Sequence, residues 1–266
     1  MKRMLLGWSG AAAVLLASAL GLPAPAGANE ACPGLVARKN PLVVPAALGK
    51  DEVGITFVGH ATFLIESPGG VRIATDYNDY VRPAVTPDVA TMNKAHSTHF
   101  SHRPDPGIRH VLRGWDPAGG PARHDLEVGD VRIRNVVTNI RDWGGGTERD
   151  GNSIFVFQTA DLCIAHLGHL HHTLTPEHLR QIGRIDVVLV PVDGSYTLDT
   201  EGMVEVLRAL NAPLMVPMHY FGQATLRRFV DRIRQEWPVD FHDKASIVVS
   251  RASLPQAPRL IVLPGH

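Results

Sequence analysis

The hydrophobic pattern of this chain changes its period near residue 175. Before that point, short apolar segments alternate with turns rich in Gly, Pro and Asp, which is typical of β-strands. Two of them, ITFVGHATFLIES and VRIATDY, flank the turn Pro68–Gly70 and predict a hairpin of two strands. Beyond residue 175, helical segments alternate with IDVVLVPV and PLMVPMHY, continuous apolar runs typical of strands buried on both faces. Strands followed by α/β alternation, with no fixed repeat, predict one layered α/β domain.

Three helices are predicted in the C-terminal part of the chain. Thr175 is placed to cap the first, with Pro176 in its first turn, and this helix continues through HLRQIGRI. Thr200 and Glu201 open the second, GMVEVLRALN, whose apolar residues recur at helical spacing. The third covers TLRRFVDRIRQEW. Before residue 175, further strands are predicted in VATM, HVLRGW, HDLEVGDVRIRNVVT and NSIFVFQTADLCIAHLG.

Residues 1–28 have the three-part pattern of a secretory signal peptide. Two basic residues precede an apolar run, and Ala26–Ala28 supplies an A-x-A cleavage site before Asn29. An uncleaved membrane anchor is the alternative, because the run approaches spanning length, but its small residues and the A-x-A favour cleavage. We therefore expect an exported protein, periplasmic or secreted, without stable membrane insertion. It would have a lead segment over residues 29–50 and one domain over residues 51–266.

Charge and cysteine content narrow the classes of partner. Lys+Arg and Asp+Glu number 26 each, so no net charge favours nucleic acid or an anionic membrane, and we expect a small-molecule substrate. Cys32 and Cys163 would be able to pair in an exported protein. Cys163 lies in a predicted buried strand, where a single cysteine usually packs as a small hydrophobic residue. Both possibilities stay open.

Histidine is abundant, with 14 residues, and it gathers at the ends of predicted strands. Loops after strands are where α/β scaffolds present functional groups, and imidazole is a common ligand of zinc and iron. A single such histidine is more often structural, but several clusters after apolar strands favour one shared metal centre. The relevant positions are His60, His96, His99, His166, His169, His171, His172 and His219.

The order of these motifs resembles the metallo-β-lactamase-fold hydrolases. The resemblance rests on VGHATFLIESPGGVRIATDY, PDVATMNKAHSTH, CIAHLGHL, DVVLVPVDGSYTLD and PLMVPMHYF, and it runs from about Ile55 to Phe221. It is closest to the branch with ascorbate-lactonase-like and phospholipase D-like enzymes. This resemblance implies an α/β fold, a four-layer αββα sandwich with one or two metal ions at one edge of the paired sheets. It also implies that a metal-activated water hydrolyses an ester, lactone, amide or phosphodiester.

The family's first motif, HxHxDH, is altered in NKAHSTHF. Its first histidine falls on Lys94 and its aspartate on Thr98, whereas His96 and His99 are retained. The bridging aspartate of the family's HLGD motif falls on His169. The remaining correspondences place a metal-1 histidine at His166, a metal-2 histidine at His219 and the structural aspartate, which orients a ligand, at Asp76.

These correspondences predict one metal ion rather than two. The metal-1 set would be His96, His166 and optionally His169, and the metal-2 set His99, His219 and optionally His169. Neither set has a carboxylate to hold two cations close together. A site of three or four imidazoles is typical of zinc, with iron or manganese as alternatives, and it makes water a nucleophile near neutral pH. His60 and Thr98, like Asp76, are expected beside the ligands.

Two further residues are candidates for catalysis. Lys94 would act as a neutral amine ligand or base, as an ammonium that holds a substrate anion in place of the missing metal, or as a solvent-facing sign of lost activity. The first role is the least favoured, because lysine rarely binds metals. Asp193 replaces a residue that is often glycine in the family. It would be a replacement carboxylate, as ligand or general base, or equally a turn residue before Gly194.

The sequence thus predicts an exported metal-dependent hydrolase with a histidine-rich, mononuclear site. The alternative is a catalytically degenerate relative that binds a small anionic ligand or a metal. A redox role with iron is a third hypothesis, because an all-histidine centre also suits that metal.

Overall fold

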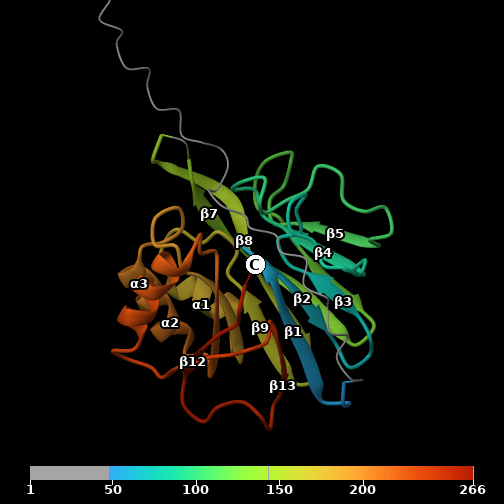
Figure 1. The fold of residues 1–266 in the computed structure, drawn as a ribbon. Coiled ribbons are helices and arrows are strands. Elements are labelled where there is room, and N and C mark those ends of the chain that lie inside the picture. Colours follow the sequence, from blue (N-terminus) through green and yellow to red (C-terminus); the bar gives the residue numbers. More distant parts are fainter. Residues whose placement is uncertain (1–47, 143, 266) are drawn as a thin grey trace, which may run out of the picture.

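The computed structural model describes residues 48–142 and 144–265, which form two β-sheets packed face to face (Figure 1). The predicted signal peptide, its cleavage site, Cys32 and nearly all of the predicted lead segment lie outside these residues. Within the described residues, no helix is long and apolar enough to cross a membrane.

The smaller sheet has six strands and contains most of the N-terminal part of the chain. Its order is β13-β1-β2-β3-β4-β5. The strands are β1 Glu52–Gly59, β2 Thr62–Glu66, β3 Arg72–Ala74, β4 Val89–Met92, β5 His110–Arg113 and, from the C-terminal part, β13 Ser246–Ser250.

The first predicted strand, ITFVGHATFLIES, is two strands. The chain reverses at His60 and Ala61, and Gly59 pairs with Thr62 across this turn. His60 has a φ of 52°, a left-handed conformation that non-glycine residues adopt mainly in turns. A continuous apolar run therefore concealed a hairpin, and His60 projects from the end of the sheet instead of from the middle of a strand.

The larger sheet has eight strands, in the order β12-β14-β11-β10-β9-β8-β7-β6. The hairpin of β7 and β8 projects beyond the rest of this sheet (Figure 1). The strands are β6 Asp125–Val128, β7 Val131–Arg141, β8 Thr147–Thr159, β9 Leu162–His166, β10 Val187–Pro191, β11 Leu214–Met218, β12 Val239–Phe241 and β14 Arg259–Val262.

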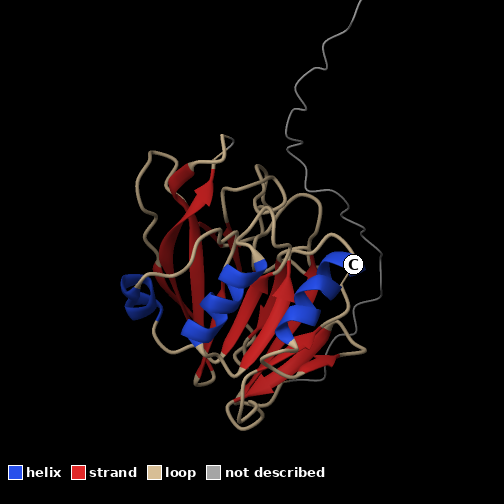
Figure 2. Cartoon of the chain, turned by 90° about the vertical axis from the view of Figure 1, so that its left-hand side faces the viewer, coloured by secondary structure: helices blue, strands red, loops and turns tan. Residues whose placement is uncertain are grey.

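The three predicted helices are present as α1 Pro176–Ile182, α2 Thr200–Leu210 and α3 Gln223–Ile233. The Thr175 hydroxyl accepts a hydrogen bond from the amide of His178, so the predicted cap of α1 is confirmed. All three helices cover the outer face of the larger sheet (Figure 2). The structure of residues 48–142 and 144–265 therefore has three of the four expected layers, with no helix on the outer face of the smaller sheet.

The core between the two sheets fixes where the loops meet. Alternate residues of both sheets, including Phe63, Phe155 and Phe157, are fully buried in this layer. Burying each aromatic ring contributes about 2–3 kcal/mol of transfer free energy, so the sheets are held in one relative position. The loops after β3, β4, β9, β10 and β11 and the β1–β2 turn consequently meet, and they carry most of the candidate residues.

Candidate metal centre

Five histidines from four loops come together at this end of the sandwich. Two pairs are in direct contact: the Nε2 atoms of His99 and His219 lie 3.1 Å apart, and those of His96 and His169 lie 2.9 Å apart. The ring of His60 lies 4.3 Å from that of His219 between centroids. Four of these side chains are buried, and His96 is half-buried. Imidazoles do not gather in a core without a reason, because each brings polar atoms that must be satisfied.

Backbone contacts explain why His60 reaches this group. The amide of His219 donates a hydrogen bond of 2.7 Å to the carbonyl of His60, which ties the β1–β2 turn to the end of β11. Both residues are in the left-handed region, with φ of 52° and 57°. Such strained residues persist where the surrounding structure holds them, and they are common at functional sites.

The spacing of the ring nitrogens, and the lack of hydrogen-bond partners for some of them within the described residues, make this group suitable for a metal ion. His60, His99 and His219 each offer one ring nitrogen within 4.8 Å of the others. Among the described residues, three buried ring nitrogens have no hydrogen-bond partner: His60 Nε2, His96 Nδ1 and His169 Nδ1. An orphaned buried donor or acceptor costs about 1–3 kcal/mol, and coordination of a cation would remove that cost for a nitrogen with its lone pair toward the ion.

Two buried carboxylates face the outer nitrogens of the central pair. Asp76 Oδ2 lies 2.5 Å from His99 Nδ1, and Asp193 Oδ2 lies 2.9 Å from His219 Nδ1. Such contacts fix the ring tautomer, with the proton on Nδ1 and a lone pair on Nε2, and orient the ring toward a metal. Asp76 is held in turn by Asn93, whose amide nitrogen donates to Oδ1 at 3.0 Å. Asp76 therefore lies directly behind His99, and its role beside a metal ligand stays a prediction.

Asp193 has a more specific position than the sequence indicated. Its carboxylate accepts hydrogen bonds from the amide of Ser195 at 2.8 Å and from the hydroxyl of Thr197 at 2.5 Å, in addition to His219. These partners occupy both oxygens, so the geometry does not suit the metal ligand or general base that was one expectation. The alternative, a turn residue, describes half of its role, because the same carboxylate orients His219.

The environment keeps four of these imidazoles neutral. Burial, followed by the proximity of other histidines, lowers the pKa of His60, His99 and His169 well below 6.5. The same causes lower the pKa of His96 to about 4. Because only a neutral imidazole has a lone pair to donate, these four rings are ready to bind a cation at neutral pH.

His166 lies outside the group, although the sequence places it among the ligands. Its Nε2 lies 2.8 Å from the carbonyl of Ala61, and its Nδ1 accepts a hydrogen bond of 3.2 Å from the amide of Gly168. Both ring nitrogens are therefore engaged elsewhere. The physical reason is the β1–β2 turn, which presents a carbonyl where the ring of His166 ends. His166 supports the turn that carries His60, and His60 takes a place in the group that the sequence did not assign to it.

Lys94 is exposed at the edge of the site. Its amino group contacts the carboxylate of Glu148 on β8, and this ion-pair geometry does not suit the neutral-amine ligand or base. Thr98 is buried next to His99. The sequence did not identify Glu148, nor the aromatic residues Tyr196 and Phe221, whose rings lie 6.1 Å from His96 and 5.4 Å from His219. Nothing in the local pattern distinguishes these three from ordinary surface residues.

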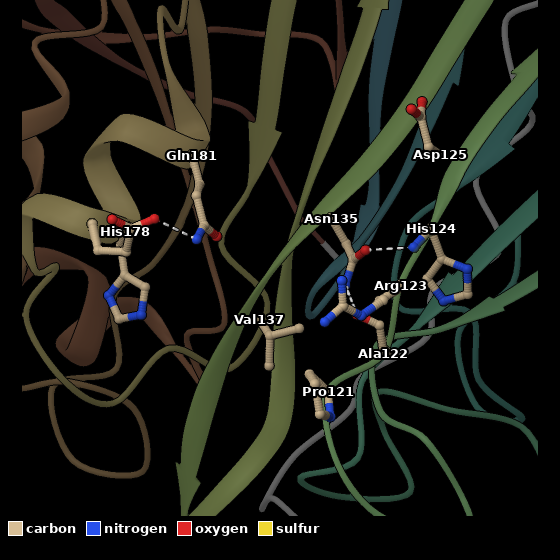
Figure 3. Close-up of a pocket in the computed structure, with 10 residues that line it drawn as sticks. Pro121, Ala122, Arg123, His124, Asp125, Asn135, Val137, His178 and Gln181 are labelled. Atoms are coloured by element: carbon tan, nitrogen blue, oxygen red, sulfur yellow. Dashed lines mark hydrogen bonds between the residues drawn. The ribbon is translucent and has the colours of Figure 1, made fainter.

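A cavity of about 580 Å³ lies elsewhere, between α1 and the β7 region (Figure 3). His178 and Gln181 project from α1 on one side, and His124 and Asn135 lie on the other. None of the five histidines lines it. The Asn135 amide is committed to the backbone carbonyl of Ala122 and the hydroxyl of Ser153, and it stabilises the chain near β6. The candidate metal ligands therefore lie in the histidine group and not in this cavity.

Comparison with known proteins gives consistent matches. A family model described as beta-lactamase superfamily domain matches residues 54–219. A UPF0173 metal-dependent hydrolase of Methanoculleus marisnigri is 24% identical over 195 residues, which cover 68% of this chain and 87% of that protein. One from Anaeromyxobacter sp. is 27% identical over 213 residues, covering 66% and 76%.

Solved structures with the same fold are also found. A Thermotoga maritima protein, described as a Zn-dependent hydrolase of the metallo-beta-lactamase superfamily, has a TM-score of 0.60 at 28% identity; the match covers 80% of this chain and 100% of that one. Igni18, a metallo hydrolase of Ignicoccus hospitalis, has a TM-score of 0.53 at 18% identity, covering 81% and 97%. The match to Igni18, at 18% identity, supports the fold only.

Proposed function

This chain belongs to the beta-lactamase superfamily, and we propose that it is a metal-dependent hydrolase. One observation carries the proposal: buried imidazoles converge, three of their ring nitrogens have no hydrogen-bond partner within the described part of the chain, and two of the rings are oriented by carboxylates. Two further findings support the proposal. Both relatives described above are named metal-dependent hydrolases, and the similar Thermotoga structure is described as a Zn-dependent hydrolase.

The metal would be held by His60, His99 and His219. These three are the closest set, and Asp76 and Asp193 support two of them from behind. His96 and His169 lie beside them, toward the cleft that Lys94 borders. When bound, the ion supplies Lewis acidity, which polarises a carbonyl or phosphoryl oxygen and makes water nucleophilic near neutral pH. An all-imidazole donor set favours zinc, with iron or manganese as alternatives.

We propose one ion, because the set of potential ligand atoms that lie closest together among residues 48–142 and 144–265 contains three imidazoles and no carboxylate. Both buried carboxylates are turned to the outer nitrogens, so the donors are neutral and two divalent cations a few ångströms apart would repel strongly. Elemental analysis of the purified protein should therefore give about one metal per chain. Two tightly bound ions per chain would contradict the proposal, and dialysis against added zinc is the check that the site was not partly emptied during purification.

The reaction class is hydrolysis of an ester, lactone, amide or phosphodiester of a small molecule. Asp76 and Asp193 contribute by holding the rings of His99 and His219 in one tautomer and orientation. A screen of model substrates of these four kinds, with and without a chelator, tests the class. Chelator-sensitive turnover of one kind supports the hydrolase; metal binding without turnover of any would favour the second candidate.

That second candidate is a degenerate relative that binds a metal or a small anion without hydrolysis. It is supported by the motif correspondence predicted from the sequence, in which Lys94 and Thr98 fall where the family has a histidine and an aspartate. The pairing of Lys94 with Glu148 weakens the case for Lys94 as an anion site, because its charge is already compensated.

We further propose that the protein is exported and acts in the periplasm or outside the cell. The basis is the signal-like pattern of residues 1–28, and the balanced charge argues for a small-molecule substrate instead of nucleic acid. Expression of the full chain in a Gram-negative host, followed by mass spectrometry of the periplasmic protein, should find an N-terminus at Asn29. A protein that stays with the membrane and keeps residues 1–28 would show an uncleaved anchor instead.

A further inference from the structure

A cleft of about 290 Å³ leads from the surface to the histidine group. Of the five histidines, His96 lines it, so a substrate that enters by this route meets the group at His96. The cleft lies between the segment after β4 and the extended end of the β7–β8 hairpin. Its volume is at the lower limit of small-molecule sites, which restricts the substrate to a compact molecule.

One wall of the cleft is apolar. Ile140 on β7 is buried, and the ring of Phe100 is half-buried against Trp115, with centroids 5.7 Å apart. A hydrocarbon or aromatic group in the cleft would cover the exposed part of the Phe100 ring, which stabilises binding by about 25 cal/mol per Å² of apolar surface removed from water.

The rim of the cleft is charged, and most of its charges are already engaged. Lys94 contacts Glu148 across the rim. The carboxylate of Asp142 accepts hydrogen bonds of 2.8 Å from the amides of Gly144 and Gly146, which turn it toward the hairpin tip. Arg141, the last residue of β7, differs. Its guanidinium is exposed and forms no ion pair or hydrogen bond with any residue of 48–142 or 144–265.

We infer that Arg141 binds an anionic group of the substrate. The substrate class is then a small ester, lactone or amide that carries a carboxylate or phosphate group, with its apolar part against Phe100 and its reacting bond toward His96. A guanidinium offers two parallel N–H donors that match either anion. The assignment of a reacting bond rests on the proposed hydrolase function. Binding of an anionic group by Arg141 does not, because it requires only the cleft.

Ligand binding tests the inference without turnover. The zinc-loaded protein is titrated calorimetrically with 3-phenylpropanoate, with its neutral amide 3-phenylpropanamide, and with 2-phenylethyl phosphate. We expect the anions to bind about tenfold more tightly than the amide, as for one charge-assisted hydrogen bond at an exposed rim. The tighter of the two anions identifies the kind of group. In Arg141→Gln this preference should disappear while binding of the amide stays the same.

Arg149→Gln is the matched control, because Arg149 is an exposed arginine of the same hairpin that does not line the cleft. It should retain the preference. Equal affinity for anion and amide in the unaltered protein would overturn the inference. So would a preference that survives Arg141→Gln but disappears when the metal is removed, because the anion would then be bound by the metal.

Kinetics separates this inference from the proposed function. For 4-nitrophenyl hemiglutarate and the neutral 4-nitrophenyl pentanoate, Arg141→Gln should raise KM about tenfold for the first and leave kcat of both unchanged. Hydrolysis of both esters with no effect of Arg141→Gln on either KM would overturn the inference and leave the hydrolase intact. Charge-selective binding without hydrolysis of any ester would leave Arg141 as an anion site and remove the hydrolase.

Discussion

His219→Ala should lose the metal and nearly all hydrolytic activity. The His219 ring is fully buried, faces His99 at 3.1 Å, and is one of three rings that share the proposed ion. Removal of one of three ligands leaves a two-histidine site with little affinity. The several kcal/mol of transition-state stabilisation from the ion then disappears, which corresponds to a fall in kcat/KM of about 10³-fold. Metal content by elemental analysis and kcat/KM on the best model substrate are the measurements.

Two control variants make this result specific. His242 is exposed and distant from the group in the chain, so His242→Ala should keep both metal and activity. His166→Gln distinguishes the ligand set of the structure from that of the sequence motif, because His166 bonds to the carbonyl of Ala61 and lies outside the group. If His166→Gln empties the site while His60→Ala leaves it full, the ligand set proposed here is wrong. Circular dichroism of each variant checks that it folds.

Asp76→Ala should weaken metal binding about 10- to 100-fold, as for other carboxylates that orient a ligating histidine. It should also lower the free energy of unfolding of the metal-free protein by about 2–4 kcal/mol. The reason is that the ring nitrogen of His99 and the amide of Asn93 would each lose a buried acceptor. Asp76 also has a φ of 40°, which alanine tolerates less well than aspartate or asparagine. Competition with a chromophoric chelator and urea unfolding measure the two effects.

Asp76→Asn separates the backbone effect from the effect of charge. It tolerates the left-handed conformation and keeps one acceptor, so its stability should fall less than that of Asp76→Ala, while its metal affinity still drops. Asp240→Ala is the matched surface control. Asp240 forms a solvent-exposed ion pair with Arg259, and removal of this pair should change the free energy of unfolding by less than about 1 kcal/mol. Unchanged metal affinity in both Asp76 variants would show that Asp76 does not support a ligand.

Much of the fold could be predicted because its signals are local. Strand β4 is found over the predicted residues, and Thr175 caps α1 as expected. The metallo-β-lactamase superfamily predicted from the motifs is confirmed by the family match. The β1–β2 turn was missed, because VGHAT has neither of the usual turn dipeptides and lies inside an apolar run. The length of the β7–β8 hairpin was also missed, since its glycine-rich end is typical of a loop.

The site could be predicted as a set of histidines but not as an arrangement. Strand-end position and the resemblance to the family motifs together selected His96, His99, His169 and His219, and the structure brings these four together. The same signal selected His166, which points to a backbone carbonyl instead. It placed His60 only beside the ligands. Whether His166 or His60 joins the group depends on the direction in which each side chain points, and the spacing of residues in the sequence does not give that direction.

The sequence by itself determined the kinds of element, their order, and the presence of many imidazoles at strand ends, because these follow from periodicity and from contacts between near neighbours. Only the tertiary structure decided which imidazoles meet. The packing of two sheets sets the β1–β2 turn against the end of β11, and the hydrogen bond from His219 to His60 fixes it there. The same packing pairs Lys94 with Glu148 and leaves Arg141 as the unpaired cation of the cleft within the described part of the chain. These contacts join residues about 50 to 160 positions apart, and their energies are set by burial and geometry that no local pattern records.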